Sequence, residues 1–300
     1  MGSTAALAAA ALLSVAIISL LAAAPATAQG KTGQVTVFWG RHKDEGSLRE
    51  ACDSGLYSMV IMSFLDVYGG SYYHLDLSGH STAGMGAAIK RCQFLGVPVS
   101  ISIGGFGGAY SLPTNASALA LFDHLWNTYF GGSLNDTRRR PFGDAWLDGV
   151  DMFLDHATPA EHYSTLALEL AKHNIRAGDG KLLHLTATPR CGFPDARVKE
   201  ALDTGIFERV HVRFYDDPDC AAGFSAAEWR KWTAAYPFTK FYVGLPASPQ
   251  AARSGFTEPG ALRRTVLPVA QTAANYGGVM VWDRYFDKRS NYSGTIKSWV

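Results

Sequence analysis

Short apolar runs rich in β-branched residues recur at fairly even intervals along the chain, and amphipathic segments separate them. Runs that are apolar on both faces are typical of buried strands in a parallel sheet, and the segments between them have helical spacing. Eight such units in roughly 250 residues predict an α/β fold, a single (β/α)8 TIM barrel. The expected strands are 34–40, 58–64, 97–104, 146–153, 182–188, 209–215, 241–245 and 278–283.

Two sequence patterns predict where helices begin. Thr158 and Glu161 have the spacing of a capping box, with Pro159 at the expected first helical position. Ser225 and Glu228 form a second capping box, whose helix should end before Pro237. Because no linker or internal repeat follows the N-terminal segment, we expect residues 29–300 to form one domain.

The first 30 residues contain no acidic or basic side chain, and residues 5–24 are apolar. Small residues at Ala26 and Ala28 match a signal-peptidase site, so residues 1–28 are predicted to be a signal peptide. The alternative is a transmembrane anchor, which an Ala-rich run followed directly by a cleavage site disfavours. We therefore expect a secreted protein, located in the extracellular space or apoplast, with no membrane segment after cleavage.

The charge balance excludes one class of partner. The chain of 300 residues has 27 Lys and Arg against 26 Asp and Glu, a formal net charge of +1. Without a basic excess to neutralise phosphates, we expect no nucleic-acid partner. Aromatic residues make up 12% of the chain, which excludes a disordered protein.

The cysteines and sequons fit export. An even number of cysteines in an exported chain predicts two disulfides, and three pairings are possible. The pairing of sequence neighbours joins Cys52 to Cys92 and Cys191 to Cys220. Since no pair has the C-x-x-C spacing of a zinc site, we expect no metal and no cofactor. Three sequons for N-glycosylation are present, at Asn115, Asn135 and Asn291.

The fourth predicted strand contains the most informative motif, Asp-Gly-Val-Asp-Met-Phe-Leu-Asp over residues 148–155. Because strand side chains alternate, Asp151, Phe153 and Asp155 share the face that points into the barrel. The motif resembles the D-G-x-D-x-D-x-E signature of glycoside hydrolase family 18, and the whole of residues 31–300 resembles its plant class III chitinases. Ser-Ile-Ser-Ile-Gly-Gly at 100–105, Val-Arg-Phe-Tyr at 212–215 and Gly-Gly-Val-Met-Val-Trp-Asp at 277–283 resemble further strand motifs of that family.

The departures from the family pattern imply that catalysis is lost. In the family, the last acid of the motif is a Glu that protonates the glycosidic oxygen, and this chain has the shorter Asp155 there. The assisting Asp, which holds the substrate acetamide, is replaced by Phe153, which can neither accept a hydrogen bond nor carry charge. Asp151 and Tyr215 match the pattern, but they cannot supply the missing roles. The resemblance therefore implies a degenerate chitinase-like protein rather than an enzyme.

A vestigial sugar cleft is expected at the C-terminal ends of the strands. Phe106 follows the Gly-Gly pair, where chitinases of this class have a small residue, and should fill the central subsite. Trp282 matches the aromatic residue at the floor of that subsite, and Trp39 is expected at the cleft as well. Weak binding of a chitooligosaccharide remains an expectation. The family resemblance also implies non-proline cis peptide bonds at Ser63–Phe64 and Trp282–Asp283.

Several segments resemble the plant xylanase-inhibitor branch of the family more closely than its active chitinases. They are residues 31–40, 166–176, 182–188 and 231–237. In that branch, an Arg at the position of Arg176 is thought to enter the catalytic cleft of a family 11 xylanase. The resemblance thus implies that Arg176 binds xylanase, with Asn174, Ile175 and Lys181 as neighbours.

The same resemblance separates two kinds of target enzyme. Branch members that also block family 10 xylanases use lysines near their last helix, whereas residues 260–275 offer Arg263 and Arg264 but no Lys. The expected function is inhibition of microbial xylanases, mainly of family 11, by a monomer acting in plant defence. The alternatives are a slow chitinase using Asp155, a chitin-binding lectin, and a storage protein.

Overall fold

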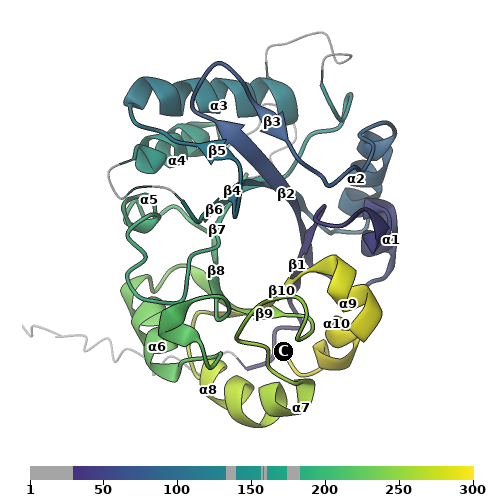
Figure 1. The fold of residues 1–300 in the computed structure, drawn as a ribbon, viewed down its shortest axis with the longest axis vertical. Coiled ribbons are helices and arrows are strands. Elements are labelled where there is room, and N and C mark those ends of the chain that lie inside the picture. Colours follow the sequence, from purple (N-terminus) through teal and green to yellow (C-terminus); the bar gives the residue numbers. More distant parts are fainter. Residues whose placement is uncertain (1–29, 133–139, 157, 159–160, 174–182) are drawn as a thin grey trace, which may run out of the picture.

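A computed structural model describes residues 30–132, 140–156, 158, 161–173 and 183–300. Within these residues, eight parallel strands close into a barrel, because β1 pairs with both β2 and β10. Figure 1 looks along the barrel and shows the ring of strands inside a ring of helices. The barrel strands, in spatial order, are β1 (Val35–Trp39), β10 (Tyr276–Trp282), β9 (Lys240–Pro246), β8 (Arg209–Arg213), β7 (His184–Ala187), β6 (Gly149–Leu154), β4 (Val99–Gly105) and β2 (Met59–Tyr68). The predicted (β/α)8 barrel is confirmed.

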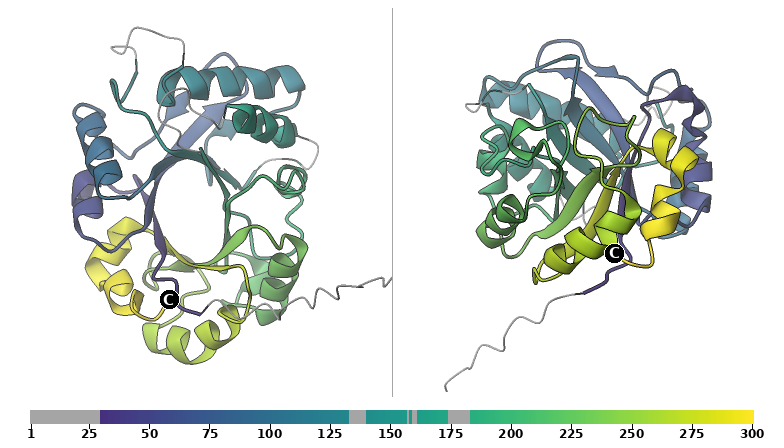
Figure 2. Two further views of the ribbon diagram at one scale, coloured as in Figure 1. Left: turned by 180° about the vertical axis from the view of Figure 1, so that it is seen from behind. Right: turned by 60° about the horizontal axis from the view of Figure 1, so that its bottom comes forward.

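The helices cover the outside of the barrel on all sides, as the two views of Figure 2 show. They are α1 (Leu48–Asp53), α2 (Met85–Phe94), α3 (Asn115–Tyr129), α4 (Tyr163–Lys172), α5 (Lys199–Leu202), α6 (Ala226–Ala235), α7 (Pro259–Ala261), α8 (Leu267–Ala270), α9 (Arg284–Ser290) and α10 (Tyr292–Ile296). The described residues also form 3-10 helices at Lys43–Glu45 and Pro218–Cys220 and a π-helical segment at Leu262–Val266.

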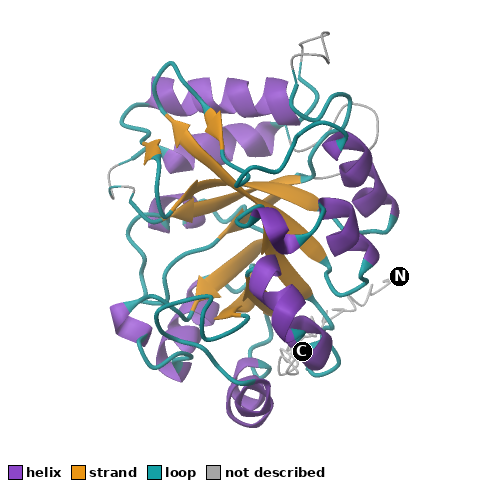
Figure 3. Cartoon of the chain, turned by 45° about the vertical axis from the view of Figure 1, so that its right-hand side comes forward, coloured by secondary structure: helices purple, strands orange, loops and turns teal. Residues whose placement is uncertain are grey.

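One strand is longer than its apolar run predicted. β2 continues to Tyr68 and pairs with two short strands, β3 (His74–Leu75) and β5 (Ala109–Tyr110). In Figure 1, β2 is the long strand that runs from the barrel wall toward β5 and α3, and Figure 3 shows the strands enclosed by the helices. The backbone of β2 thus positions the loop after β4, which contains Phe106.

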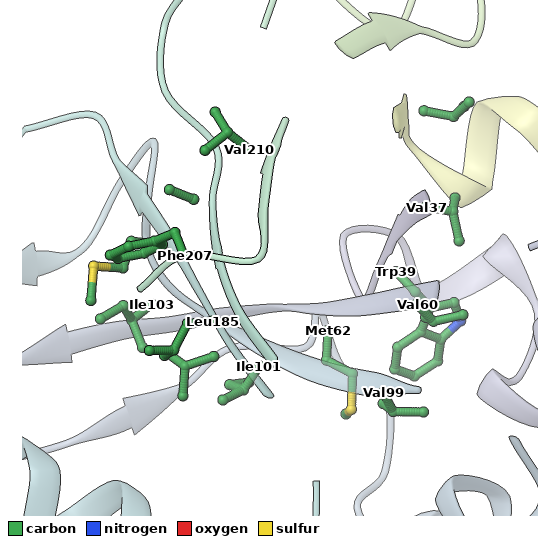
Figure 4. Close-up of a cluster of buried hydrophobic side chains, with 14 of the residues drawn as sticks. Val37, Trp39, Val60, Met62, Val99, Ile101, Ile103, Leu185, Phe207 and Val210 are labelled. Carbon is green, nitrogen blue, oxygen red and sulfur yellow. The ribbon is translucent and has the colours of Figure 1, made fainter. Parts of the chain in front are cut away.

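The strands divide the core into two layers. Side chains that alternate outward pack against the helices, and Figure 4 shows part of this outer layer, including Val37, Val60 and Ile101. Inward-pointing side chains form a second, smaller cluster inside the barrel, made of Phe38, Met59, Ile61, Phe64, Phe153, Tyr215, Tyr242, Met280 and Trp282. This inner cluster is where the family's sugar subsite was expected.

One of the two predicted helix starts is correct. α6 begins after Ser225, whose side chain accepts the N–H of Glu228 as predicted, and it ends before Pro237. α4 begins at Tyr163 rather than at Pro159, so that prediction was wrong. Glu161 does accept the N–H of Thr158, at 3.3 Å, but its other oxygen accepts the N–H of Leu112, at 2.7 Å. The carboxylate therefore ties the chain before the helix to a neighbouring segment.

Covalent and backbone features agree with the sequence predictions. The disulfides are Cys52–Cys92, which links α1 to α2, and Cys191–Cys220, so the pairing of sequence neighbours is confirmed. The peptide bonds Ser63–Phe64 and Trp282–Asp283 are cis, as the family resemblance implied. A third cis bond precedes Pro194. In the described part of the chain, none of the helices is long and apolar enough to cross a membrane.

Candidate functional site

β6 places the three motif residues as the alternation predicted. Asp151 and Phe153 are fully buried inside the barrel, while Val150 and Met152 belong to the outer layer. Asp155 follows the last residue of β6, and its side chain is 12% exposed. The structure therefore brings the assisting position and the general-acid position to one end of the barrel interior.

Asp151 is held by hydroxyl groups. Its carboxylate accepts hydrogen bonds from Ser102 at 2.8 Å, Thr186 at 2.6 Å and Thr188 at 2.9 Å. The ring of His211 lies 3.6 Å away, and burial lowers the pKa of this histidine despite the nearby carboxylate. A fully buried carboxylate needs such donors, since an unpaired charge in the interior is costly. Asp151 thus organises the polar middle of the barrel.

Asp155 is paired with two arginines. Arg190 approaches side-on, with Nε 3.1 Å from Oδ1 and Nη2 3.1 Å from Oδ2, and Arg213 Nη2 lies 2.9 Å from Oδ1. Burial raises the pKa of Asp155, but the hydrogen bond from Arg190 and the charge of Arg213 outweigh this effect and hold the pKa below its ordinary value. A general acid needs the opposite shift, because it must keep its proton near neutral pH. Asp155 is therefore ionised and has no proton to donate.

Arg213 is the residue of this site that the sequence reasoning missed. Its side chain is 1% exposed, and its guanidinium lies 4.1 Å from the ring centre of Phe153. The signal was available in the sequence. Arg213 is two residues from both His211 and Tyr215, so all three share the inward face, and a buried Arg requires a carboxylate partner. In this arrangement Phe153 and Asp155 together accommodate the cation, one by its ring face and one by its charge.

Aromatic rings occupy the space above Asp151. The ring centre of Phe106 lies 4.8 Å from that of Phe153 and 5.3 Å from that of Trp282, both in edge-to-face geometry. Phe64 adds a contact of 5.1 Å to Phe153. Trp282 is only 7% exposed, whereas Phe106 is 38% exposed and forms much of the solvent-facing surface of this aromatic cluster. The positive φ of Gly104, at 101°, starts the turn that leads to Phe106.

A second segment covers the aromatic cluster from the side of β9. Ala251 and Ala252, in the loop after β9, pack against the inner cluster. The side chain of Asp216 holds this loop by accepting the N–H groups of Arg253, at 2.7 Å, and Ser254, at 3.2 Å. Phe106 and this loop thus close the expected sugar subsite from two directions.

Trp39 corrects one sequence prediction. It was expected at the cleft, but it alternates with Phe38 and belongs to the outer layer, as Figure 4 shows. Its indole N–H donates to the carbonyl of Gly46 at 3.0 Å, and its ring packs at a tilt against that of His80, with 4.3 Å between the ring centres. Trp39 is therefore a packing residue between the barrel and α1 rather than part of a sugar site.

Tyr215 keeps the family position at the end of β8. Its side chain is 1% exposed and lies 6.4 Å from Trp282 between ring centres. Burial raises the pKa of its hydroxyl. Among the described residues this buried hydroxyl has no hydrogen-bond partner.

The residues predicted to bind xylanase, Asn174, Ile175, Arg176 and Lys181, lie outside the described residues, as does the sequon Asn135. The described chain ends before them at His173, after α4, and resumes at Leu183, before β7. His173 and Leu183 themselves lie toward the N-terminal end of the barrel, whereas Asp155 and Phe106 lie at the C-terminal end.

The two described sequons are at helix ends. Asn115 is the first residue of α3, and its side-chain oxygen accepts the hydroxyl of Thr165 at 2.7 Å. Asn291 has a positive φ of 53° between α9 and α10. Both asparagines are exposed. For metals, the described residues contain no group of three or more His, Cys, Asp or Glu side chains that could hold an ion.

Comparisons with known proteins agree with this geometry. Residues 34–254 match the glycosyl hydrolases family 18. The chain is 63% identical to xylanase inhibitor protein 1 of Triticum aestivum, over 96% of this chain and 95% of the relative, and 48% identical to xylanase inhibitor protein 1 of Oryza sativa, over 94% of each. The crystal structure of the xylanase and alpha-amylase inhibitor protein XAIP-II from Scadoxus multiflorus superposes with a TM-score of 0.82 at 36% identity, covering 89% of this chain and 98% of that one. The chain therefore belongs to glycosyl hydrolases family 18, in the group that includes the plant xylanase inhibitor proteins.

Proposed function

We propose that this protein is a secreted inhibitor of microbial endo-1,4-β-xylanases, mainly of family 11, that acts in plant defence and has lost chitinase activity. The observation that carries the loss of catalysis is the pairing of Asp155 with Arg190 and Arg213 beneath a cluster of aromatic rings. Inhibition is supported by the similarity to named xylanase inhibitors along nearly the whole chain.

We assign the xylanase contact to Arg176, with Asn174, Ile175 and Lys181 beside it. Family 11 xylanases have two catalytic carboxylates in a cleft, and the planar guanidinium of an Arg matches carboxylate geometry. Family 10 enzymes should be inhibited weakly or not at all, because residues 260–275 contain no Lys. Arg263 in this stretch lies 5.1 Å from the ring centre of Trp299, which it covers.

The deciding experiment is a titration of purified mature protein against one xylanase of each family. Inhibition of the family 11 enzyme is expected, and Arg176→Ala should raise its inhibition constant at least about tenfold, since a buried charge pair is lost. Arg253→Ala is the matched control, because this Arg is 90% exposed and lies in the loop after β9. An unchanged constant for Arg176→Ala would refute the assignment of this residue, and no inhibition by the unmodified protein would refute the function.

The three rival functions have their own measurements. Hydrolysis of a fluorogenic chitooligosaccharide above the level of Asp155→Asn would indicate a slow chitinase. A saturable change of Trp fluorescence with chitooligosaccharide would indicate a lectin, with Trp282 as the reporter. A storage protein would bind neither sugar nor xylanase.

The proposal includes export and processing. Cleavage of residues 1–28 predicts a mature chain that starts at Gln29, which N-terminal sequencing of the purified protein tests. Glycans at Asn115, Asn135 and Asn291 would appear as mass lost on treatment with a glycosidase. We expect a monomer, and light scattering during gel filtration measures that directly.

A further inference from the structure

The loop after β1 contains a buried carboxylate with several donors. Glu45 is fully buried, and its Oε1 accepts the N–H of Gly40 at 2.8 Å, the N–H of His42 at 3.0 Å and Nε2 of His80 at 3.1 Å. Its Oε2 is buried and has no hydrogen-bond partner within the described ranges. His80 comes from the chain between β3 and α2, so this contact fastens the β1 loop on one side.

A second histidine fastens the same loop on its other side. Nε2 of His42 lies 3.5 Å from Oδ2 of Asp283, a carboxylate that is 1% exposed. Oδ1 of Asp283 accepts the N–H groups at the start of α9. The His42 ring stacks on Tyr285 at 4.1 Å and meets Phe286 edge-on at 5.4 Å. His42 therefore joins the first strand's loop to the last strand's helix.

This junction is where the barrel closes. Val37 of β1 pairs with Val281 of β10, so His42 and Asp283 follow neighbouring strands from the two ends of the chain. Figure 1 shows α9 beside α1 and the start of β1. A contact across this seam ties together parts of the fold that the sequence separates by more than 200 residues.

The charged groups around both rings favour protonation. His42 faces Asp283 and Glu45, and the nearby cations are Arg41, which pairs with Asp76 at 3.1 Å, and Arg289, which covers the ring of Tyr285. The contact with Asp283 raises the pKa of His42 more than burial lowers it.

His80 is surrounded in the same way. It faces Glu45, Asp44 and the carbonyl of His42, and its ring packs at a tilt against that of Trp39. The hydrogen bond to Glu45 raises the pKa of His80 above its ordinary value despite burial. Each histidine is thus set against a buried carboxylate, with carboxylates as its main charged neighbours.

We propose that His42 and His80 form an acid-dependent latch, which fastens the β1 loop across the closing seam when both rings are protonated and loosens it when both are neutral. The direction of the pH dependence follows from the raised pKa of each ring. A histidine that binds its proton more tightly in the folded state stabilises that state, and this contribution is fully present below the ordinary pKa. The contribution is then lost as the pH rises through the higher folded value. The latch is therefore closed in acid and opens as the pH rises through the raised folded pKa values of the two rings.

The first test is an NMR titration of the imidazole signals in the unmodified protein. Both rings are expected to titrate above the ordinary pKa of about 6.5. If either ring titrates at or below that value, its part in the latch is overturned. This measurement needs no variant and no xylanase, so its result is independent of the proposed inhibition.

The second test compares variants at about pH 5.5 and about pH 8. The unfolding equilibrium constant of the unmodified protein should rise at least about threefold more between these conditions than that of His42→Gln/His80→Gln. His162→Gln, at the start of α4, is the control and should follow the unmodified protein. Equal pH responses of the double variant and the unmodified protein would overturn the latch. If the double variant does not fold, the two single variants replace it.

A third readout locates the change. The backbone N–H groups of Gly40 and His42 donate hydrogen bonds to Glu45. Their hydrogen exchange should be faster at the higher pH, after correction for the pH dependence of the intrinsic exchange rate. This loss of protection should be absent from the amides of β6. Uniform loss of protection throughout the barrel would contradict a local latch.

Discussion

At the scale of single residues, a short exchange of side chains converts an acid site into a charge-paired core. Shortening Glu to Asp at position 155 would by itself leave a carboxyl group that could take up a proton. Arg190 and Arg213 remove that option, because they stabilise the ionised form. The substitution of Phe153 and the pairing of Asp155 therefore act together, since the same Arg213 contacts both.

The pairing makes a prediction about stability. Arg213→Met should lower the free energy of unfolding by about 2–4 kcal/mol, because Asp155 would keep its charge in a mostly buried place with one arginine fewer. Urea unfolding at neutral pH measures this loss. Arg209→Met, at the start of the same strand, is a control. Its partner Glu208 is 43% exposed, so this variant should lose less unfolding free energy. An effect of Arg213→Met no larger than that of the control would show that the pairing contributes little.

The pH dependence of the same pair follows from the lowered pKa of Asp155. A carboxyl with a depressed folded pKa stabilises the fold above its unfolded value, about 4, and this contribution is lost as the pH falls through the lower folded value. Between about pH 4 and about pH 2, Asp155→Asn should therefore lose less stability than the unmodified protein. Parallel curves of unfolding free energy against pH for the two proteins would contradict the assignment.

Much of this site could be predicted from the sequence, and the remainder shows what a pattern leaves out. The alternation in β6 placed Asp151, Phe153 and Asp155 correctly, since a strand has only two faces. Trp39 was placed on the wrong face, because the last residue of a strand can be assigned to either the cleft or the outer layer until the register is known. The partners of Asp155 come from β8 and the chain after β7, and only the closed barrel brings them to β6.

At the scale of elements, the loops after β4 and β9 cover the aromatic cluster inside the barrel. Phe106 covers Phe153 and Trp282 from one side, and Ala251 with Ala252 cover the inner cluster from the other. The strands themselves form the closed barrel, with the cis peptide at Trp282–Asp283 that the family resemblance implied.

Phe106→Ala should open the outer part of this subsite. We expect chitooligosaccharide to bind the variant at least about tenfold more tightly than it binds the unmodified protein, because one face of Trp282 becomes available for stacking. Hydrolysis should remain absent, since Asp155 stays paired. Trp fluorescence measures the binding. Phe238→Ala, which removes a ring that is 97% exposed in the α6–β9 loop, is the control. Equal sugar affinity in both variants would show that the loop after β9 closes the subsite alone.

At the scale of the whole molecule, the filled cleft and the residues that flank Arg176 in the sequence lie at opposite ends of the barrel. Asp155 and Phe106 follow the C-terminal ends of their strands, whereas His173 follows α4 and Leu183 precedes β7 at the N-terminal end. Eight strands and their packed core separate these two ends. We therefore expect loss of catalysis and inhibition of xylanase to depend on different residues.

This separation predicts an asymmetry between variants. Phe106→Ala should leave the inhibition constant for a family 11 xylanase within about twofold of the unmodified value, whereas Arg176→Ala should raise it at least about tenfold. Saturating chitooligosaccharide added to Phe106→Ala should also leave inhibition unchanged, because we assign the xylanase contact to Arg176 and not to the cleft. If Phe106→Ala weakens inhibition more than Arg176→Ala does, the xylanase docks at the cleft end. The aromatic rings that close the vestigial subsite would then be the contact surface.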